Sequence, residues 1–424
     1  ENEERTKSLS LTPLMCAAAY NSNPDVLAIL IESGARINAK GGLGSTPLGI
    51  AAALNTNDEI TALLIKGGAD IQATNDYGGA PLDLAANSNP NPKVTALLIE
   101  GGADINTTLG PIGGTPLMSA SAESSVDVIS VLVKAGMKIE AKDQDGATPL
   151  IYAATWANQE TVSFLIEKGA NLHARDNDGN SALMHALSNN ENLNVVSLLI
   201  DNGAKIQDRN NFGWTPLMKA CNNQNSEMVA LLIKLGVDVD AKERLGMSAV
   251  AVAAANPNPE VLFKLIEAGA KIDVYVDGGF TPLMYASERN PNPAVCSLLL
   301  QNGADIEAVS EDGKNVLMWA ANNSNPDVLA FLISSGAEVE AKDNFGSTPL
   351  MYAAILNTNP EFISILIKAG AKPDAKTARE GVTALMLAAS GNPNPDIIEA
   401  LIKAGADPQA KDMWGKTFRD YLAE

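Results

Sequence analysis

Hydrophobic and polar positions along this chain recur in a fixed order, about every 33 to 35 residues. Each repeat opens with a cap residue, Pro and Leu, and continues with a pair of small residues and a loop rich in Asn and Pro. An aliphatic stripe at helical spacing follows, as in Val26, Leu27, Leu30 and Ile31, and a glycine ends it. The pattern predicts two short helices in each repeat, joined by a loop and followed by a turn.

The starts of the repeats carry the signals of a helix N-terminus. A Thr hydroxyl can accept a backbone N–H that has no partner within the helix, and Pro has no N–H to leave unsatisfied at the first helical position. Thr-Pro-Leu begins at Thr12, Thr46, Thr115, Thr148, Thr215, Thr281 and Thr348, and degenerate copies begin at Ala80, Ser181, Ser248, Asn315, Thr383 and Thr417. Ser and Asn keep the capping oxygen, whereas Ala80 lacks it.

Glycine occupies two fixed positions in each repeat. The first ends the second helix, where a left-handed cap favours a residue without Cβ. The second lies two residues before the next start, for example Gly313 and Gly346, and indicates the tight turn of a projecting hairpin.

Together these features resemble the ankyrin repeat, over essentially the whole chain. The family pattern is a hairpin turn, Thr-Pro-Leu-His, Ala-Ala, a second helix and Gly-Ala-Asp, and residues 346–374 follow it closely. The resemblance implies an all-α ankyrin-repeat α-solenoid of about twelve helix-turn-helix units with projecting hairpin turns and terminal caps. We expect one domain over residues 1–424, with units starting near 12, 46, 80, 115, 148, 181, 215, 248, 281, 315, 348 and 383 and a C-terminal cap over 411–424. The Asn-Pro loops resemble bacterial members of the family.

Two departures from the family pattern lead to further expectations. The histidine that usually follows Leu is absent, and most units place a methionine there, for example Met118 and Met351. Because an apolar, flexible side chain replaces a polar one, we expect looser hairpin order. The first unit has Ser10 where later units have glycine, so we expect it to lack a full hairpin.

Composition narrows the classes of partner. The net charge is −20 and hydrophobic residues make up 46% of the chain. Nucleic acid and anionic membrane surfaces are therefore not expected as partners, because both need clustered Lys and Arg. A basic partner protein fits the charge, and a role of the charge in solubility alone fits equally well. No apolar run reaches the roughly 18 residues that a membrane span needs.

The residues that carry chemistry are sparse. There are two histidines, His173 and His185, and three widely spaced cysteines, Cys16, Cys221 and Cys296, without metal-ligand or disulfide spacing. No nucleophile motif or phosphate-binding glycine loop is present. We expect no catalytic residues, no metal and no cofactor, and hence no enzyme. The protein is expected to be soluble and monomeric, and either cytoplasmic or, if a signal peptide has been removed, secreted or periplasmic.

Aromatic residues single out one side of the predicted solenoid. The resemblance implies that partners meet the hairpin tips and first helices, which line a concave groove, and 12 of the 19 aromatic residues fall at such positions. The candidate binding residues are Tyr152, Trp156, Phe212, Trp214, Phe280, Tyr285, Trp319, Phe345 and Tyr352. The first-helix members among them could instead pack between neighbouring first helices. The tip aromatics cluster in the seventh to eleventh units, so the binding centre is predicted there.

The sequence therefore predicts a protein-interaction scaffold that binds a partner in its groove. An inhibitor or immunity protein that occludes a basic toxin or enzyme is the alternative, and an enzyme is the third and least favoured class. Replacing Trp214 or Phe280 with alanine is predicted to weaken partner binding without lowering stability.

Overall fold

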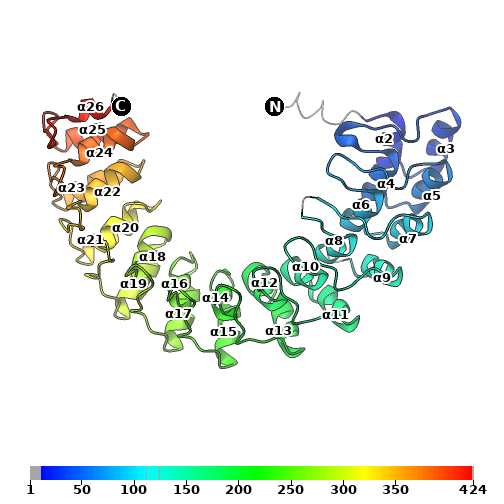
Figure 1. Ribbon diagram of the computed structural model, residues 1–424, viewed down its shortest axis with the longest axis horizontal. Coiled ribbons are helices and arrows are strands. Elements are labelled where there is room, and N and C mark those ends of the chain that lie inside the picture. The colour runs from blue at the N-terminus through cyan, green and yellow to red at the C-terminus, as the bar shows by residue number, and fades with distance from the viewer. Residues whose placement is uncertain (1–10, 111, 124, 423–424) are drawn as a thin grey trace. The chain divides into compact units, whose positions relative to one another are not determined.

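A computed structural model describes residues 11–110, 112–123 and 125–422. Over these residues the protein is built from α-helices, with one 3-10 turn at Gly42–Gly44 and no β-strand (Figure 1). Ser10, where a shortened first hairpin was expected, lies outside the described residues. None of the helices in the described part of the chain has the length and apolar character needed to cross a bilayer.

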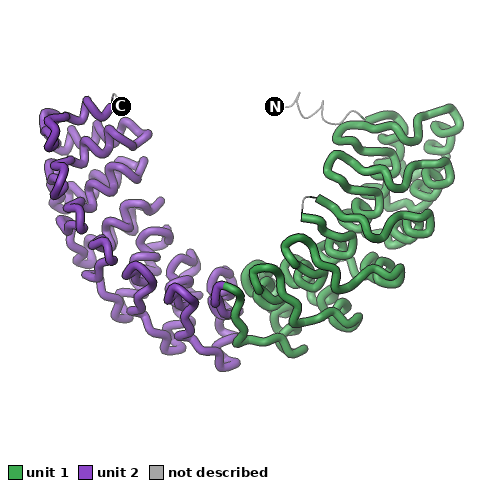
Figure 2. The backbone as a smooth tube through the Cα atoms, viewed as in Figure 1, with its two compact units in different colours: residues 1–211 green, residues 212–424 purple. Residues whose placement is uncertain are grey.

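The chain divides into two compact units, Glu1–Asn211 and Phe212–Glu424, called unit 1 and unit 2 (Figure 2). In each, the first helices of successive repeats form one layer and the second helices form another (Figure 1). The first helices of unit 1 are α2 (Pro13–Tyr20), α4 (Pro47–Leu54), α6 (Pro81–Ser88), α8 (Pro116–Ala122), α10 (Pro149–Trp156) and α12 (Ala182–Asn189). Its second helices are α3 (Pro24–Glu32), α5 (Asp58–Lys66), α7 (Pro92–Glu100), α9 (Val126–Lys134), α11 (Gln159–Glu167) and α13 (Leu193–Asp201).

Unit 2 continues the same alternation of helices. Its first helices are α14 (Pro216–Ala220), α16 (Ala249–Ala254), α18 (Pro282–Arg289), α20 (Val316–Ala320), α22 (Pro349–Leu356), α24 (Ala384–Gly391) and α26 (Phe418–Leu422). Its second helices are α15 (Ser226–Lys234), α17 (Pro259–Glu267), α19 (Pro293–Gln301), α21 (Pro326–Ser334), α23 (Glu361–Lys368) and α25 (Pro395–Lys403). Every first helix begins one residue after a predicted start, which confirms the predicted solenoid. The single domain predicted over residues 1–424 stays a prediction.

Methionine has a specific place at the start of the first helix. The Met118 backbone N–H donates to Thr115 Oγ1 at 3.3 Å, and the Thr115 N–H donates to Met118 Sδ at 3.3 Å. The thioether thus completes a reciprocal cap, with its side chain fully buried. Where Ala80 lacks the capping oxygen, the Asp83 carboxylate accepts the Ala80 N–H at 2.9 Å.

Successive hairpins are joined by backbone hydrogen bonds between their tips. The Asn344 N–H donates to the Asp312 carbonyl at 3.0 Å, and the Ala378 N–H donates to the Phe345 carbonyl at 2.9 Å. Gly346 allows the hairpin backbone to come close to Ala378. Its φ is +79°, and a Cβ at this position would lie 2.5 Å from the Ala378 nitrogen. These bonds argue against the looser hairpin order expected from the missing histidine.

The core repeats with the sequence. In the repeat of α18 and α19, Leu283 and Ala286 of the first helix and Val295 and Leu299 of the second helix are almost fully buried. Burying one such Leu or Val side chain contributes about 1.5–3 kcal/mol, and small residues such as alanine let first helices pack closely. Because each repeat contacts mainly its neighbours, this apolar layer is extended by one segment for every repeat added.

An asparagine that follows most of the first helices ties neighbouring repeats together. The Asn290 amide donates to the carbonyls of Ala254 at 2.9 Å and Asn256 at 2.7 Å, one repeat earlier, while its Oδ1 accepts the N–H of Asn292 at 3.0 Å. Equivalent asparagines repeat this pair of bonds, and we call them the asparagine ladder: Asn55, Asn89, Asn190, Asn256, Asn290, Asn323, Asn357 and Asn392.

The ladder satisfies main-chain groups that would otherwise be buried without a partner. Asn290 is fully buried, so water cannot replace its amide at the two carbonyls. At the corresponding position of the repeat that begins at Thr148 stands Ala157, whose methyl group cannot donate. The loop of that repeat is also shorter, since only two residues separate α10 from α11. The Asn-rich loops are therefore links between repeats as well as turns.

Candidate binding surface

In unit 2, three aromatic rings from two neighbouring repeats form a packed cluster. Phe280 lies at the end of the hairpin before α18, Tyr285 lies on α18, and Trp319 lies on α20. The Phe280 ring centroid lies 4.6 Å from that of Trp319 and 5.6 Å from that of Tyr285, with tilted planes. Such contacts add about 0.5–1.5 kcal/mol to simple burial. Phe280 therefore joins the hairpin to two first helices, and we call the three rings the aromatic cluster.

Basic side chains lie over the faces of these first-helix aromatics. Lys314 Nζ is 4.6 Å from the ring centroid of Trp319 and 5.2 Å from that of Tyr352, and it pairs with Asp312 at 2.8 Å. Burial alone would raise the pKa of Asp312, but hydrogen bonds from Lys314 and Ser310 hold it below its usual value. The cluster thus presents apolar rings bordered by paired charges.

The Trp319 indole N–H is buried and finds no acceptor among the described residues. Tryptophan in interiors and interfaces usually satisfies this donor. The ring is held here by its packing against Phe280 and by the Lys314 ammonium group.

Two predicted residues lie open on hairpin tips of unit 2. Phe345 is 58% exposed and Phe212 is 53% exposed. Trp214, two residues after Phe212, is half-buried, and Lys219 Nζ lies 5.3 Å from its ring centroid. Phe345 therefore offers most of an aromatic ring to solvent, whereas Phe280 is packed against other rings. Replacing Phe280 is now expected to lower stability as well as binding.

Tyr352 supports the hairpin that presents Phe345. Its hydroxyl donates to Asp343 Oδ2 at 2.8 Å, and Asp343 Oδ1 accepts the backbone N–H groups of Phe345 at 2.9 Å and Ser347 at 2.7 Å. Burial, together with the Asp343 carboxylate, raises the pKa of the Tyr352 phenol. The Tyr352 side chain therefore has a structural role, and only a minor part of the residue is exposed.

In unit 1, the remaining predicted residues, Tyr152 and Trp156, lie on α10. Tyr152 repeats the arrangement of Tyr352, because its hydroxyl donates to Asp143 Oδ2 at 2.8 Å. Trp156, at the end of α10, is 66% exposed. Both side chains line an open pocket of about 540 Å³ together with residues of the next hairpin and of α12.

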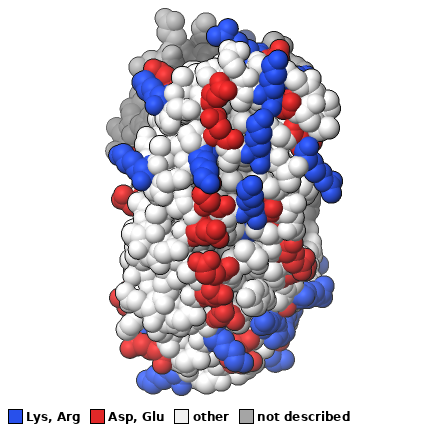
Figure 3. All heavy atoms as spheres, turned by 90° about the vertical axis from the view of Figure 1, so that its left-hand side faces the viewer, with Lys and Arg blue, Asp and Glu red and all other residues white. Residues whose placement is uncertain are grey.

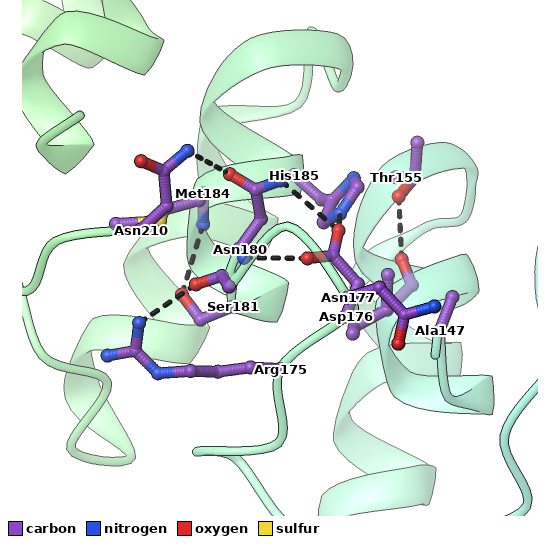
Figure 4. A network of polar contacts seen from close by, with 12 residues as sticks. Ala147, Thr155, Arg175, Asp176, Asn177, Asn180, Ser181, Met184, His185 and Asn210 are labelled. Atoms are coloured by element: carbon purple, nitrogen blue, oxygen red, sulfur yellow. Dashed lines mark hydrogen bonds and ion pairs between the residues drawn. The ribbon is translucent and has the colours of Figure 1, made fainter. Parts of the chain in front are cut away.

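A polar network forms the floor of this pocket (Figure 4). His185 Nε2 lies 2.7 Å from Asp176 Oδ2, and Asn180 donates to the same carboxylate through its backbone and side chain. Burial alone would raise the pKa of Asp176, but the hydrogen bonds from His185 and Asn180 outweigh it and lower the pKa. His185 takes the place that Tyr152 and Tyr352 have in their repeats.

One face of unit 2 carries charged side chains of both signs. Figure 3 shows the side of unit 2 that lies at left in Figure 1, where acidic side chains gather in a column with Lys and Arg beside them. Exposed ion pairs such as Lys403 with Glu399, at 3.0 Å, contribute little stability. This face carries both signs of charge and offers no uniform field to a partner.

A sequence profile of ankyrin repeats in three copies matches residues 14–109, 82–176, 170–243, 249–343 and 336–412. The matches cover most of the chain and agree with the stacked helix pairs, the capped starts and the joined hairpins. The chain belongs to the ankyrin-repeat family. Comparison with curated proteins finds no match.

Ankyrin repeats are generally protein–protein interaction modules, and the family typically serves as a non-enzymatic scaffold. Among the residues that the structure describes, no three His, Cys, Asp or Glu side chains come together in a way that could hold a metal ion. Cys221 and Cys296 are buried, and burial raises the pKa of both thiols, to about 12 for Cys296. A high thiol pKa leaves little nucleophilic thiolate at neutral pH.

Sequence reasoning about this ankyrin chain missed the acidic partners of the first-helix residues. Asp143 and Asp343 lie nine positions before Tyr152 and Tyr352, and Asp176 lies nine positions before His185. The fixed spacing of nine residues between an aspartate in the hairpin and a hydrogen-bond donor in the first helix is visible in the sequence and could have indicated these pairs.

Replacing Tyr352 with phenylalanine is expected to lower the free energy of unfolding by about 1 kcal/mol at neutral pH, because Asp343 loses a buried donor. Since the folded protein raises the phenol pKa, this contribution is complete below the ordinary value of about 10 and is lost as the pH rises toward the folded value. Urea unfolding followed by circular dichroism at neutral pH and at about pH 11 should show a smaller difference at the higher pH.

The matched control for this substitution is Tyr275→Phe in the same unit. Tyr275 is 51% exposed, so its replacement should leave stability unchanged. A Tyr352→Phe protein as stable as the native one at neutral pH would show that the bond to Asp343 does not hold the hairpin.

Proposed function

We propose that this chain is a scaffold that binds a partner protein in a groove formed by hairpin tips and first helices. The observation that carries the proposal is the exposure of Phe345, 58%, at a hairpin tip in the same unit as the aromatic cluster. Aromatic side chains that are rigid and partly open are the commonest anchors of protein interfaces. In a chain with only 4% aromatic residues, their gathering here favours binding over chance exposure.

The proposed centre of binding lies in unit 2, in the seventh to eleventh repeats. The residues assigned to it are Phe212, Trp214, Phe280, Tyr285, Trp319, Phe345 and Tyr352, and Tyr152 and Trp156 of unit 1 form a second contact region. Phe212, Phe345 and Trp156 are proposed to contact the partner most directly, because more than half of each side chain is exposed. The free protein is proposed to be a monomer.

The acidic balance favours a second candidate, an inhibitor or immunity protein that occludes a basic toxin or enzyme. With a net charge of −20, association with a basic partner would be fast and steeply dependent on salt. A scaffold without electrostatic steering would lose little association rate as salt is added. Measuring the association rate of a captured partner at low and high ionic strength therefore separates the two candidates.

Replacing Phe345 with alanine is expected to weaken partner binding about ten-fold or more without changing the melting temperature, because the ring is mostly exposed. Partners are captured from cell extract on the native chain and identified. Each purified partner is then titrated by calorimetry against both proteins.

Phe263→Ala is the matched control, since Phe263 is a 37% exposed phenylalanine on the second helix α17 of the same unit. The control should bind as the native chain does. Equal affinities for all three proteins, or a loss confined to Phe263→Ala, would refute binding at the hairpin tips.

A further inference from the structure

The pocket of unit 1 has a lining rich in aspartate. It lies between the hairpins that precede α10 and α12, and its volume is about 540 Å³. Four aspartates line it, Asp143, Asp145, Asp176 and Asp178, with no lysine or arginine among the described lining residues. Apart from His185, which is paired with Asp176, the ionisable side chains of the lining are carboxylates and the Tyr152 phenol, unlike the mixed face of unit 2.

Two of the four carboxylates are already used within the fold. Asp143 accepts from Tyr152 and from the Ala147 backbone, and Asp176 accepts from His185 and Asn180. These bonds orient the two hairpins and the first-helix side chains around the pocket, and Figure 4 shows those of Asp176. The floor is thus built before any ligand arrives, which lowers the cost of ordering on binding.

The other two carboxylates lie at the exposed hairpin tips. The Asp145 carbonyl accepts the N–H of Asn177 at 2.8 Å, and the Asp178 carbonyl accepts the N–H of Asn211 at 2.9 Å. Each aspartate's main chain is thus bonded to the hairpin of the next repeat. Neither carboxylate forms an ion pair with a Lys or Arg of the described chain. Both carboxylates can therefore pair with a cationic group of a binding partner.

Trp156 adds a large aromatic side chain to the lining of the same pocket. Its side chain is 66% exposed although indole is among the largest apolar groups, and it lines the same hollow as Tyr152. A flat cation can stack on an indole face while its edge donates to carboxylates. An ammonium group lacks this planar face, and a neutral apolar group would leave the acidic rim unpaired.

We propose that this pocket takes an arginine side chain of the partner protein, with the guanidinium stacked on Trp156 and hydrogen-bonded to Asp145 and Asp178. The proposal rests on the proposed function, because it names a chemical feature of the partner that the scaffold binds. The charge and shape of the lining select the guanidinium group.

Arginine amide tests this assignment without any partner. The indole N–H resonance of Trp156 is identified by its absence from Trp156→Phe protein, and the labelled native chain is titrated with arginine amide, citrulline amide and lysine amide. Arginine amide should shift this resonance in a saturable way, lysine amide should bind several-fold more weakly, and citrulline amide, whose side chain is uncharged, should cause no shift.

Two variants and a control locate the site. Asp145→Asn and Asp178→Asn should each weaken arginine amide about five-fold, because a charge-assisted hydrogen bond is lost. Asp201→Asn, an exposed aspartate of α13 in the same unit, should leave the affinity unchanged.

The proposal is overturned if citrulline amide or calcium ion shifts the Trp156 resonance as strongly as arginine amide, or if both pocket variants bind as the control does. If the pocket fails these tests while Phe345→Ala still weakens a captured partner, only the arginine assignment is lost. If arginine amide binds as predicted but Phe345→Ala has no effect on partners, the proposed unit 2 surface fails instead.

Discussion

Replacing Asn290 with alanine should lower the free energy of unfolding by about 2–4 kcal/mol, the largest expected loss from removing one polar side chain. Asn290 is fully buried, and its amide donates to the carbonyls of Ala254 and Asn256 while its oxygen accepts from Asn292. Alanine would leave two buried carbonyls and one partly buried N–H without their partners. Urea unfolding followed by circular dichroism gives the difference directly.

Two further variants separate the causes of this loss. Asn290→Asp keeps the shape and the acceptor but removes both donors, so it should be at least as unstable as the alanine variant at neutral pH. Asn302→Ala is the control, since Asn302 is exposed and bonds only to Leu298 of its own helix. An Asn290→Ala protein within about 0.5 kcal/mol of the control would show that the ladder adds no stability.

Replacing Trp319 with alanine should have the largest combined effect, lowering stability by about 2–4 kcal/mol and partner affinity about a hundred-fold. The indole contacts both Phe280 and Lys314, so its loss removes the nearer of the two ring contacts of Phe280 and one cation–π contact of Lys314. Affinity is measured by calorimetry well below the melting temperature of the variant, where circular dichroism still matches the native protein.

The control for Trp319 is Trp414→Ala near the end of the chain, where the indole is 59% exposed. It should leave both quantities close to native values. If Trp319→Ala lowers stability as expected but binds the partner normally, the aromatic cluster is only a structural element. The binding role would then pass to the exposed tips.

The parts of the fold that sequence predicted depend on nearby residues. A Thr cap acts within one helical turn, as when Thr46 accepts the N–H of Gly49, and the cap glycines act on their own φ, as at Gly303 with φ of +95°. Because these effects are local and recur in each repeat, the starts of the first helices could be placed to the residue and the ends of the second helices to within two residues. The all-helical solenoid followed from that regularity.

The asparagine ladder could not be predicted in the same way. Asn290 and Asn302 are both asparagines that follow a helix, yet one bonds across 34 and 36 residues and the other across four. The two asparagines differ in whether carbonyl groups of the preceding repeat lie within reach of the side chain. A linear pattern does not show which carbonyls of a neighbouring repeat come that close. The loop asparagines were therefore interpreted as turn residues alone.

The candidate site was predicted only in part, because contacts between neighbouring repeats also determine which of its aromatic rings are exposed. Sequence placed Phe280 and Phe345 together as tip aromatics, but the next repeat gives Phe280 a tryptophan to pack on and leaves Phe345 open. The acidic pocket beside Trp156 needed the side-by-side placement of two hairpins, which a linear pattern does not show.

The central claim is that hairpin tips and first helices bind the partner. Hydrogen exchange of the chain with and without a captured partner, followed by mass spectrometry, tests it most directly. If these elements bind the partner, amide exchange should become slower in residues 212–214, 279–281 and 343–347 and in α18 and α20, with α17, α19 and α21 unchanged. Protection confined to the second helices, with the hairpin tips exchanging as in the free chain, would contradict it.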